Sequence, residues 1–181
     1  LAVRGTTVEG GLPAIGLGVV GSDLVGADGP DLPAGVPADA VEVTSDQLEV
    51  QRIRAGVPAW GAELDEDTIP ATVGQWVIDA SVSFTKGCYT GQELVARIDS
   101  RGGNVPRHLM GIVVDGPPPA RDAVVTVDRR SIGDITSSAL DHASGATVAL
   151  AFVKRSVDLA DGGTPVEVAG VPATLVTLPI A

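Results

Sequence analysis

Sulfur and aromatic side chains are scarce in this chain of 181 residues. It holds one cysteine, one methionine and one tyrosine, and aromatic residues make up only 3% of it. A single cysteine excludes an internal disulfide and suits a reducing compartment, so we expect a cytoplasmic protein. With so few rings the core has to be built from Val, Leu, Ile and Ala. Together with 23 glycines and 13 prolines, this favours short strands and turns over a helical bundle.

Long hydrophobic runs are also lacking. The longest, residues 11–20, is rich in glycine and too short to cross a bilayer, so we expect no membrane contact. The sequence begins without Met and shows no signal-peptide arrangement. It contains no P-loop, dinucleotide fingerprint or nucleophile elbow, and the isolated His108 and His142 have no partners at metal-ligand spacing. No metal site is therefore predicted, and neither histidine is given a role.

Cations are outnumbered by acids, 12 to 23, and the net charge of −11 argues against direct binding to nucleic acid. The imbalance is uneven along the chain. Residues 1–85 carry three cations and thirteen acids, whereas residues 86–109 carry four cations and two acids. This basic stretch is either a group of solvated cations or a site for an anionic ligand, and charge alone favours the solvated group.

The cysteine lies in the basic stretch, within residues 83–107, which we call the cysteine segment. It reads S-F-T-K-G-C-Y-T-G-Q-E-L-V-A-R-I-D-S-R-G-G-N-V-P-R. Thr90 and Glu93 have the spacing of a capping box, and Tyr89 and Leu94 stand at the positions of a hydrophobic staple. The pattern predicts a short helix that has Thr90 as its N-cap and ends at the Gly-Gly pair.

Cys88 is thus expected two residues before a helix N-terminus. Unpaired N–H groups and the helix dipole favour an anion there, and Lys86 adds a nearby cation. Such surroundings favour the thiolate, so we predict that Cys88 is partly exposed and reactive. The alternative is a small buried apolar residue. Glu93 fits a cap better than an acid catalyst, whereas Gln92 has no evident structural role and is the better candidate for ligand contact.

Residues 86–93, K-G-C-Y-T-G-Q-E, resemble the signature of the YgfZ-type folate-binding proteins. These are relatives of the glycine-cleavage T-protein (aminomethyltransferase) and are linked to iron–sulfur cluster maintenance. The continuation A-R-I-D-S-R-G-G-N-V-P-R-H-L is similar as well, and a weaker resemblance runs from about Leu48 to the C-terminus. It implies a folate-binding protein, with tetrahydrofolate as cofactor, that acts in iron–sulfur cluster assembly or repair and thereby in tRNA modification.

The resemblance also implies roles for single residues. Cys88 and Lys86 are the candidates for catalysis, and the candidates for folate contact are Tyr89, Gln92, Glu93, Arg97 and Arg101. One cysteine cannot hold an iron–sulfur cluster alone, so a cluster would be transient or shared with an iron–sulfur protein as partner. The sequence does not decide whether a reaction is catalysed, which folate form binds, or what the oligomeric state is.

Two alternatives stay open. Residues 51–64 resemble the T-protein segments R-x-E-A-G and G-x-E-L, but Arg54 stands where T-proteins have an acid that helps to bind the pterin. This departure favours the YgfZ-type branch over an aminomethyltransferase that moves a one-carbon unit to tetrahydrofolate. The other alternative is a non-catalytic interaction module that docks through its acidic first half. Trp60 and Trp76 are expected in the core or in a pocket wall.

We expect an α+β protein with two parts. Residues 1–106 would form part of the aminomethyltransferase-like folate-binding domain, with a loop over residues 26–40 and a capped helix from Thr44 to Arg54. Residues 107–181, with short strands at regular spacing, would form a small antiparallel β-barrel. Family members are longer and close three domains around a folate cavity, so residues 1–181 alone are expected to bind folate weakly or not at all.

Overall fold

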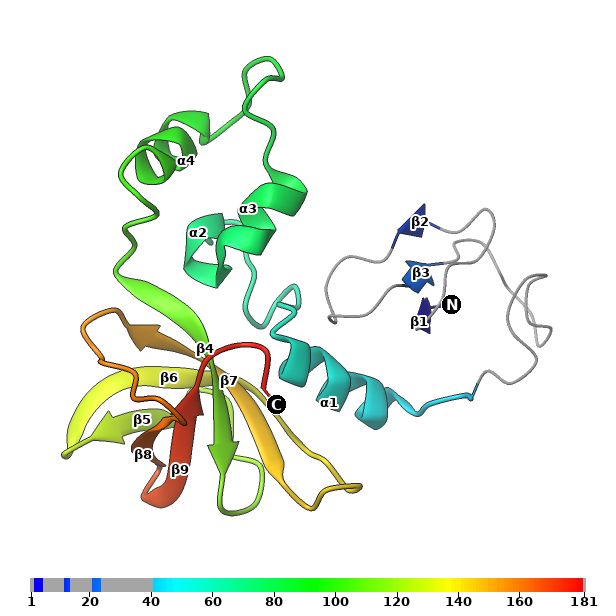
Figure 1. Ribbon diagram of the computed structural model, residues 1–181, viewed down its shortest axis with the longest axis vertical. Coiled ribbons are helices and arrows are strands. Elements are labelled where there is room, and N and C mark those ends of the chain that lie inside the picture. The colour runs from blue at the N-terminus through cyan, green and yellow to red at the C-terminus, as the bar shows by residue number, and fades with distance from the viewer. Residues whose placement is uncertain (1, 5–11, 14–20, 24–40, 181) are drawn as a thin grey trace.

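The computed structural model describes residues 2–4, 12–13, 21–23 and 41–180 (Figure 1). The first three ranges are short strands, β1 (Ala2–Arg4), β2 (Leu12–Pro13) and β3 (Gly21–Asp23). They form an antiparallel sheet in the order β1-β3-β2. The loop expected over residues 26–40 lies outside the described residues.

The first helix, α1 (Ser45–Ala55), forms as its sequence predicts. The Gln47 N–H donates to Thr44 Oγ1 at 3.2 Å, and the Thr44 N–H donates to Gln47 Oε1 at 2.8 Å, which completes the capping box. The helix ends at Gly56, whose φ of 73° lies in the left-handed region that glycine adopts without strain. Val50 and Ile53 form its buried face.

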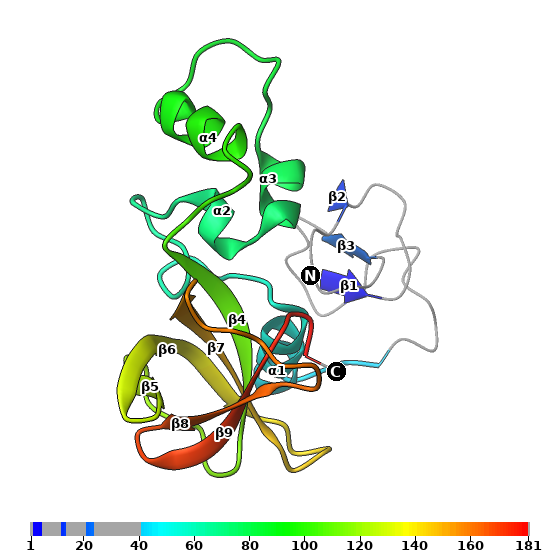
Figure 2. The ribbon, with the colours of Figure 1, turned by 60° about the vertical axis from the view of Figure 1, so that its left-hand side comes forward.

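Three shorter helices follow: α2 (Pro70–Val73), α3 (Gln75–Ser81) and α4 (Gln92–Asp99). The views in Figures 1 and 2 show α2 and α3 between α4 and the barrel. The sequence pattern did not predict α2 and α3. Trp60 and Trp76, expected in the core or in a pocket wall, are 75% and 37% exposed, so neither lies in the core, and neither lines a pocket found among the described residues. A core rich in aliphatic side chains forms without them.

The C-terminal half is a closed antiparallel barrel with the strand order β4-β7-β6-β5-β8-β9, as the sequence predicts. Its strands are β4 (Arg107–Val114), β5 (Val124–Val127), β6 (Arg130–Leu140), β7 (Thr147–Lys154), β8 (Thr164–Val168) and β9 (Val171–Val176). Closure pairs β4 with both β7 and β9, so no strand edge of the barrel is left open.

Strand β7 separates two hydrophobic cores. Its inward side chains, Ala149, Ala151 and Val153, lie in the barrel interior. Its outward side chains, Val148, Leu150 and Phe152, pack with the buried face of α1 and with Val73 of α2. On β7 the smaller side chains face the barrel interior and the larger ones face the helices, so α1 and α2 are fixed on the barrel wall. The overall class is α+β, as expected.

Candidate functional site

The cysteine segment starts just after α3, contains α4 and ends at the first residue of β4 (Figure 1). None of the residues of α4 is buried. Among the helices and strands, α4 contacts mainly α2. The segment therefore consists of one short helix and its two flanking loops, and most of its side chains face solvent.

The start of α4 differs from the predicted capping box. The N-cap is Gly91, with a left-handed φ of 82°, and no side chain caps the helix. The prediction that Thr90 is the N-cap is wrong, because the left-handed glycine makes the helix begin one residue later than the capping-box spacing requires. Cys88 accordingly lies three residues before the N-cap, further from the helix end than expected.

Gln92 has the structural role that the sequence did not reveal. Its side-chain oxygen accepts a hydrogen bond from the Tyr89 N–H at 3.2 Å, and its own N–H donates to the Tyr89 carbonyl at 3.3 Å. This reciprocal pair closes the turn between the two residues. Leu94, the other half of the predicted staple, is 38% exposed.

Cys88 is exposed, in line with the predicted accessibility of its sulfur. On the same turn, the Lys86 ammonium lies 4.7 Å from the centre of the Tyr89 ring, in a cation–π contact. Lys86 itself is exposed and Tyr89 is half-buried. The turn thus presents a thiol, an amine and an aromatic ring together at the surface.

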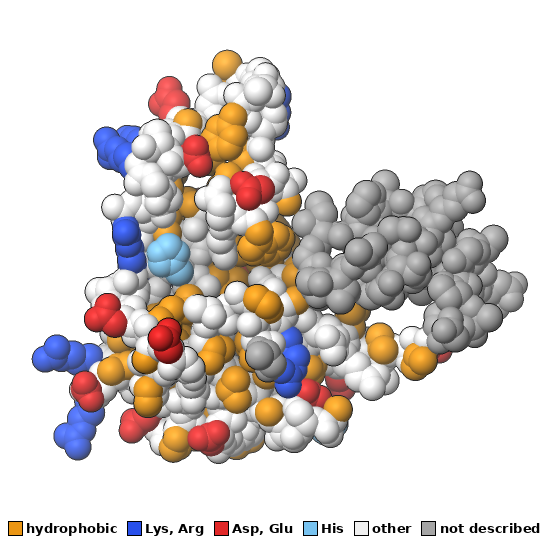
Figure 3. Space-filling model, in the orientation of Figure 1, with side chains coloured by type: hydrophobic (Ala, Val, Ile, Leu, Met, Phe, Trp, Pro, Cys, Tyr) orange, Lys and Arg blue, Asp and Glu red, His pale blue; other side chains and the backbone are white. Residues whose placement is uncertain are grey.

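The remaining predicted residues do not gather around Cys88 into a pocket. Glu93, Arg97 and Arg101 are exposed. A small hollow beside α4 is lined mostly by apolar side chains, among them Ile78 and Ile98, and Cys88 does not line it. Figure 3 shows basic, acidic and apolar side chains mixed over this part of the surface, without a field of one sign.

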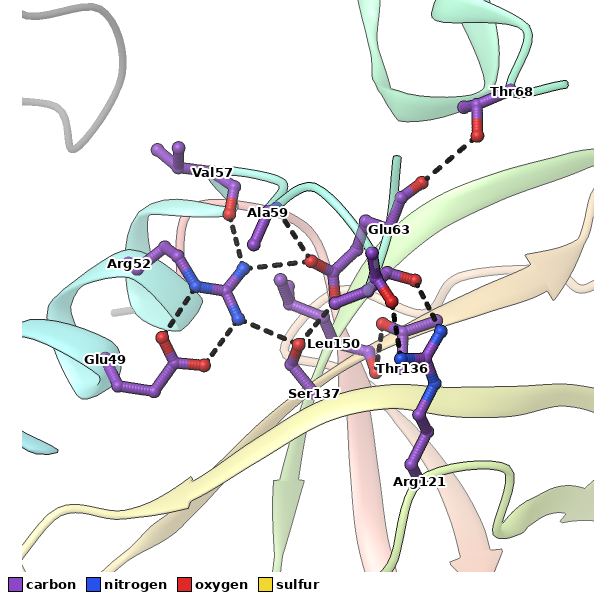
Figure 4. Close-up of polar contacts among 12 residues, drawn as sticks. Glu49, Arg52, Val57, Ala59, Glu63, Thr68, Arg121, Thr136, Ser137 and Leu150 are labelled. Atoms are coloured by element: carbon purple, nitrogen blue, oxygen red, sulfur yellow. Dashed lines mark hydrogen bonds and ion pairs between the residues drawn. The ribbon is translucent and has the colours of Figure 1, made fainter. Parts of the chain in front are cut away.

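A second polar group, which no local sequence pattern predicts, lies between α1 and the barrel (Figure 4). The Glu63 side chain is fully buried. Its carboxylate accepts hydrogen bonds from Arg52 Nη1 at 2.9 Å, from the Ala59 N–H at 2.9 Å and from Ser137 Oγ at 2.6 Å. Each carboxylate oxygen therefore has a partner, as a buried charge requires.

Arg52 completes this group. It forms a two-bond pair with Glu49, at 2.8 and 2.5 Å, and donates to Ser137 Oγ at 2.8 Å. Burial opposes the charged guanidinium, but the carboxylates of Glu49 and Glu63 outweigh it and raise the Arg52 pKa. Arg52 and Glu63 are the two charged residues that match the R-x-E-A-G and G-x-E-L segments, so these matching positions join α1 to the barrel.

Arg54 also points at the barrel. Its Nη2 lies 2.9 Å from Asp141 Oδ2, in the turn between β6 and β7. Hydrogen bonds from Ser144 and Arg54 lower the Asp141 pKa to about 2. Asp141 also supports the turn itself, since its carboxylate accepts a hydrogen bond from the Ala143 N–H at 3.0 Å. Arg54 at the position of the T-protein acid therefore makes a structural ion pair.

The described residues contain no group of three or more side chains that could hold a metal ion. Within the same ranges, no helix is long and apolar enough to span a bilayer.

A protein-family model matches the barrel, and similar proteins match a larger part of the chain. Residues 107–180 match the family described as the glycine cleavage T-protein C-terminal barrel domain. The chain is also similar in fold to the aminomethyltransferase of Bartonella henselae, with a TM-score of 0.54 over 74% of this chain and 37% of that one. At 19% identity, this likeness bears on the fold alone.

Curated relatives come from both branches of the superfamily. An aminomethyltransferase of Rippkaea orientalis is 30% identical over 65% of this chain and 30% of its own length. The tRNA-modifying protein YgfZ of Aliivibrio fischeri is 33% identical over 60% of this chain and 35% of its own length. The chain thus spans about a third of the length of these relatives. Residues 107–180 therefore carry the T-protein C-terminal barrel, and the chain as a whole is similar to aminomethyltransferases and to YgfZ-type proteins.

Proposed function

We propose that the protein is a folate-binding protein of the YgfZ type that acts in iron–sulfur cluster assembly or repair, and thereby in tRNA modification. The similarity to the tRNA-modifying protein YgfZ supports this assignment, as does the signature at residues 86–93. Tetrahydrofolate would be its ligand and iron–sulfur proteins its partners. The proposal sets the protein in the cytoplasm, where a lone cysteine stays reduced.

The observation that carries the proposal is the exposure of Cys88. A thiol attacks an electrophile or binds iron through its thiolate, and both reactions need access from outside. Because one thiolate cannot hold a cluster alone, the cluster or its damaged form would be shared with a partner protein. Lys86, fixed over the Tyr89 ring, would supply positive charge beside the reacting sulfur.

Folate contact is assigned to the side chains around this turn. Arg97 and Arg101 form no ion pair within the part of the chain that the structure describes, so both are available for the carboxylates of a folate tail. Tyr89 and Glu93 would border the same ligand. Gln92 is the weakest member of the set, because closing the Tyr89 turn already occupies its side-chain oxygen.

Aminomethyl transfer is the second candidate, and the contact of Arg54 disfavours it. In T-proteins an acid at this position helps to bind the pterin, whereas Arg54 carries the opposite charge and is paired with Asp141. A guanidinium in this place cannot accept the N–H groups of a pterin ring.

Complementation tests the proposal. A strain that lacks its YgfZ-type protein would receive the full-length protein as wild type, Cys88→Ala or Thr85→Ala, and iron–sulfur-dependent tRNA modification would be measured. Thr85 is an exposed neighbour on the same segment and serves as the matched control. We expect the wild type and Thr85→Ala to restore modification and Cys88→Ala to fail. Equal restoration by all three would refute a role for the sulfur.

Folate binding gives a separate prediction. Residues 1–181 alone are expected to bind tetrahydrofolate weakly or not at all, because the chain spans about a third of the length of its relatives and Cys88 lines neither of the hollows found among the described residues. Calorimetric titration of this chain would measure it. Binding with a micromolar Kd would contradict the prediction, since a complete site would then lie within these residues.

A further inference from the structure

One end of the barrel interior is bordered by basic side chains. Along β4, Ile112 and Val114 lie in the interior core and Met110 packs against it, whereas Leu109 belongs to the core under α1. Because the side chains of a strand alternate between its two faces, His108, the second residue of β4, faces the barrel interior. A half-buried imidazole therefore stands where the aliphatic interior ends.

Strand β7 brings a cation to the same end. Val153 faces the interior, and Arg155, an exposed residue in the turn directly after the strand, lines the same pocket as His108 and Val153. The antiparallel register pairs His108 with Val153, which sets Arg155 beside the start of β4. Burial and the charge of Arg155 both lower the His108 pKa, so the guanidinium acts on the imidazole across this end.

These residues border a pocket of about 180 Å³ at the mouth of the barrel. Its floor is apolar, with Val153 and Leu175 fully buried and Met110 and Val157 partly so. None of the described residues that line it is acidic. The Lys154 amine is held by the Ser131 carbonyl at 2.9 Å, while the Arg155 guanidinium has no carboxylate partner among the described residues.

We propose that this pocket binds a small organic carboxylate, with its apolar body on the floor and its carboxylate on Arg155. Arginine offers two parallel N–H donors that match a carboxylate, and barrel mouths are common places for small-ligand sites. The volume is below the roughly 300–1,000 Å³ of pockets for drug-sized ligands, so the body is a single ring or a short chain. Since no residue of the cysteine segment lines the pocket, the site does not depend on the proposed function.

Benzoate is a suitable probe, with benzamide as an uncharged compound of the same shape. Both would be titrated at pH 7 into the 181-residue chain, with the methyl signals of Val153 and Leu175 and the ring signals of His108 followed by NMR. We expect benzoate to shift these signals in a saturable way at millimolar concentration. Benzamide should bind at least about tenfold more weakly, because a charge-assisted hydrogen bond is lost.

Arg155→Gln should weaken benzoate to the level of benzamide, whereas Arg130→Gln, which removes an exposed arginine on β6, should leave benzoate binding unchanged. The backbone NMR spectrum of each variant is the control for folding and should match that of the wild type outside the substituted position. The proposal is wrong if benzoate gives no saturable shift, if benzoate and benzamide bind equally, or if the two arginine variants behave alike. Inorganic phosphate that binds as tightly as benzoate would also overturn it, since the apolar floor would then contribute nothing.

Discussion

At the residue scale, Glu63 is the side chain whose surroundings constrain it most. It is a fully buried carboxylate whose three hydrogen-bond donors come from α1, from the loop after it and from β6. Removing one member of such a group leaves another charge without its counterpart, which costs more than the pair contributes. The group therefore fixes how α1 lies on the barrel.

Glu63→Gln is expected to lower the free energy of unfolding by about 2–3 kcal/mol, because Arg52 loses one of two carboxylates and a buried amide replaces a charge acceptor. Urea denaturation would measure the change. Glu66→Gln, an exposed acid three residues away, is the control and should stay within about 0.5 kcal/mol of the wild type. Equal stability of both variants would contradict the structural role of Glu63.

Asp141 gives a prediction on pH dependence. Its pKa of about 2 lies below the ordinary 3.8, so its contribution to stability is present above pH 3.8 and is lost as the pH falls towards 2. NMR titration of the carboxyl carbon should find this low midpoint. Arg54→Gln should raise it part of the way to 3.8, since the Ser144 hydrogen bond remains, and Arg130→Gln should not move it. An ordinary midpoint in the wild type would contradict the ion pair.

At the element scale, two similar sequence patterns give different helix starts. Thr44 and Gln47 form a complete capping box, whereas Thr90 and Glu93 do not, although both pairs have the same spacing. The difference lies in Gly91, whose left-handed conformation moves the start of α4 by one residue. In place of a capping box, Tyr89 and Gln92 form a reciprocal pair of hydrogen bonds.

Thr44→Ala and Thr90→Ala form a matched pair that tests this difference. Loss of a side-chain cap costs typically about 1 kcal/mol, so Thr44→Ala should lower the free energy of unfolding by that amount. Thr90→Ala should change it by less than about 0.5 kcal/mol, because this exposed hydroxyl caps nothing. Urea denaturation of both variants would decide, and a larger loss at Thr90 would show that the predicted box does form.

Local patterns were sufficient for α1 and for the barrel strands, because capping and alternation are properties of neighbouring residues. They failed for α2 and α3, which are too short to show a helical period. They also failed for the Glu63 group. The matching R-x-E-A-G and G-x-E-L segments contained Arg52 and Glu63, but Ser137 lies 85 residues after Arg52, and only the folded chain brings them together.

At the scale of the whole molecule, structure and candidate chemistry are separated. The barrel and α1 hold the buried cores and the buried polar group, while the cysteine segment lies beyond α2 and α3 with none of the residues of α4 buried (Figure 2). A region with few buried contacts can change its conformation while the barrel and α1 stay folded. This arrangement suits a segment that meets a partner or a ligand.

Alkylation of Cys88 tests this separation most directly, and the chain has no other cysteine to confuse the result. Iodoacetamide would be added to the native 181-residue chain and to the same chain in urea, and incorporation would be followed by mass spectrometry. The exposed sulfur predicts native and unfolded rates of the same order of magnitude. Protection of the native protein by about a hundredfold or more, as for a thiol that reacts only on opening, would contradict the account.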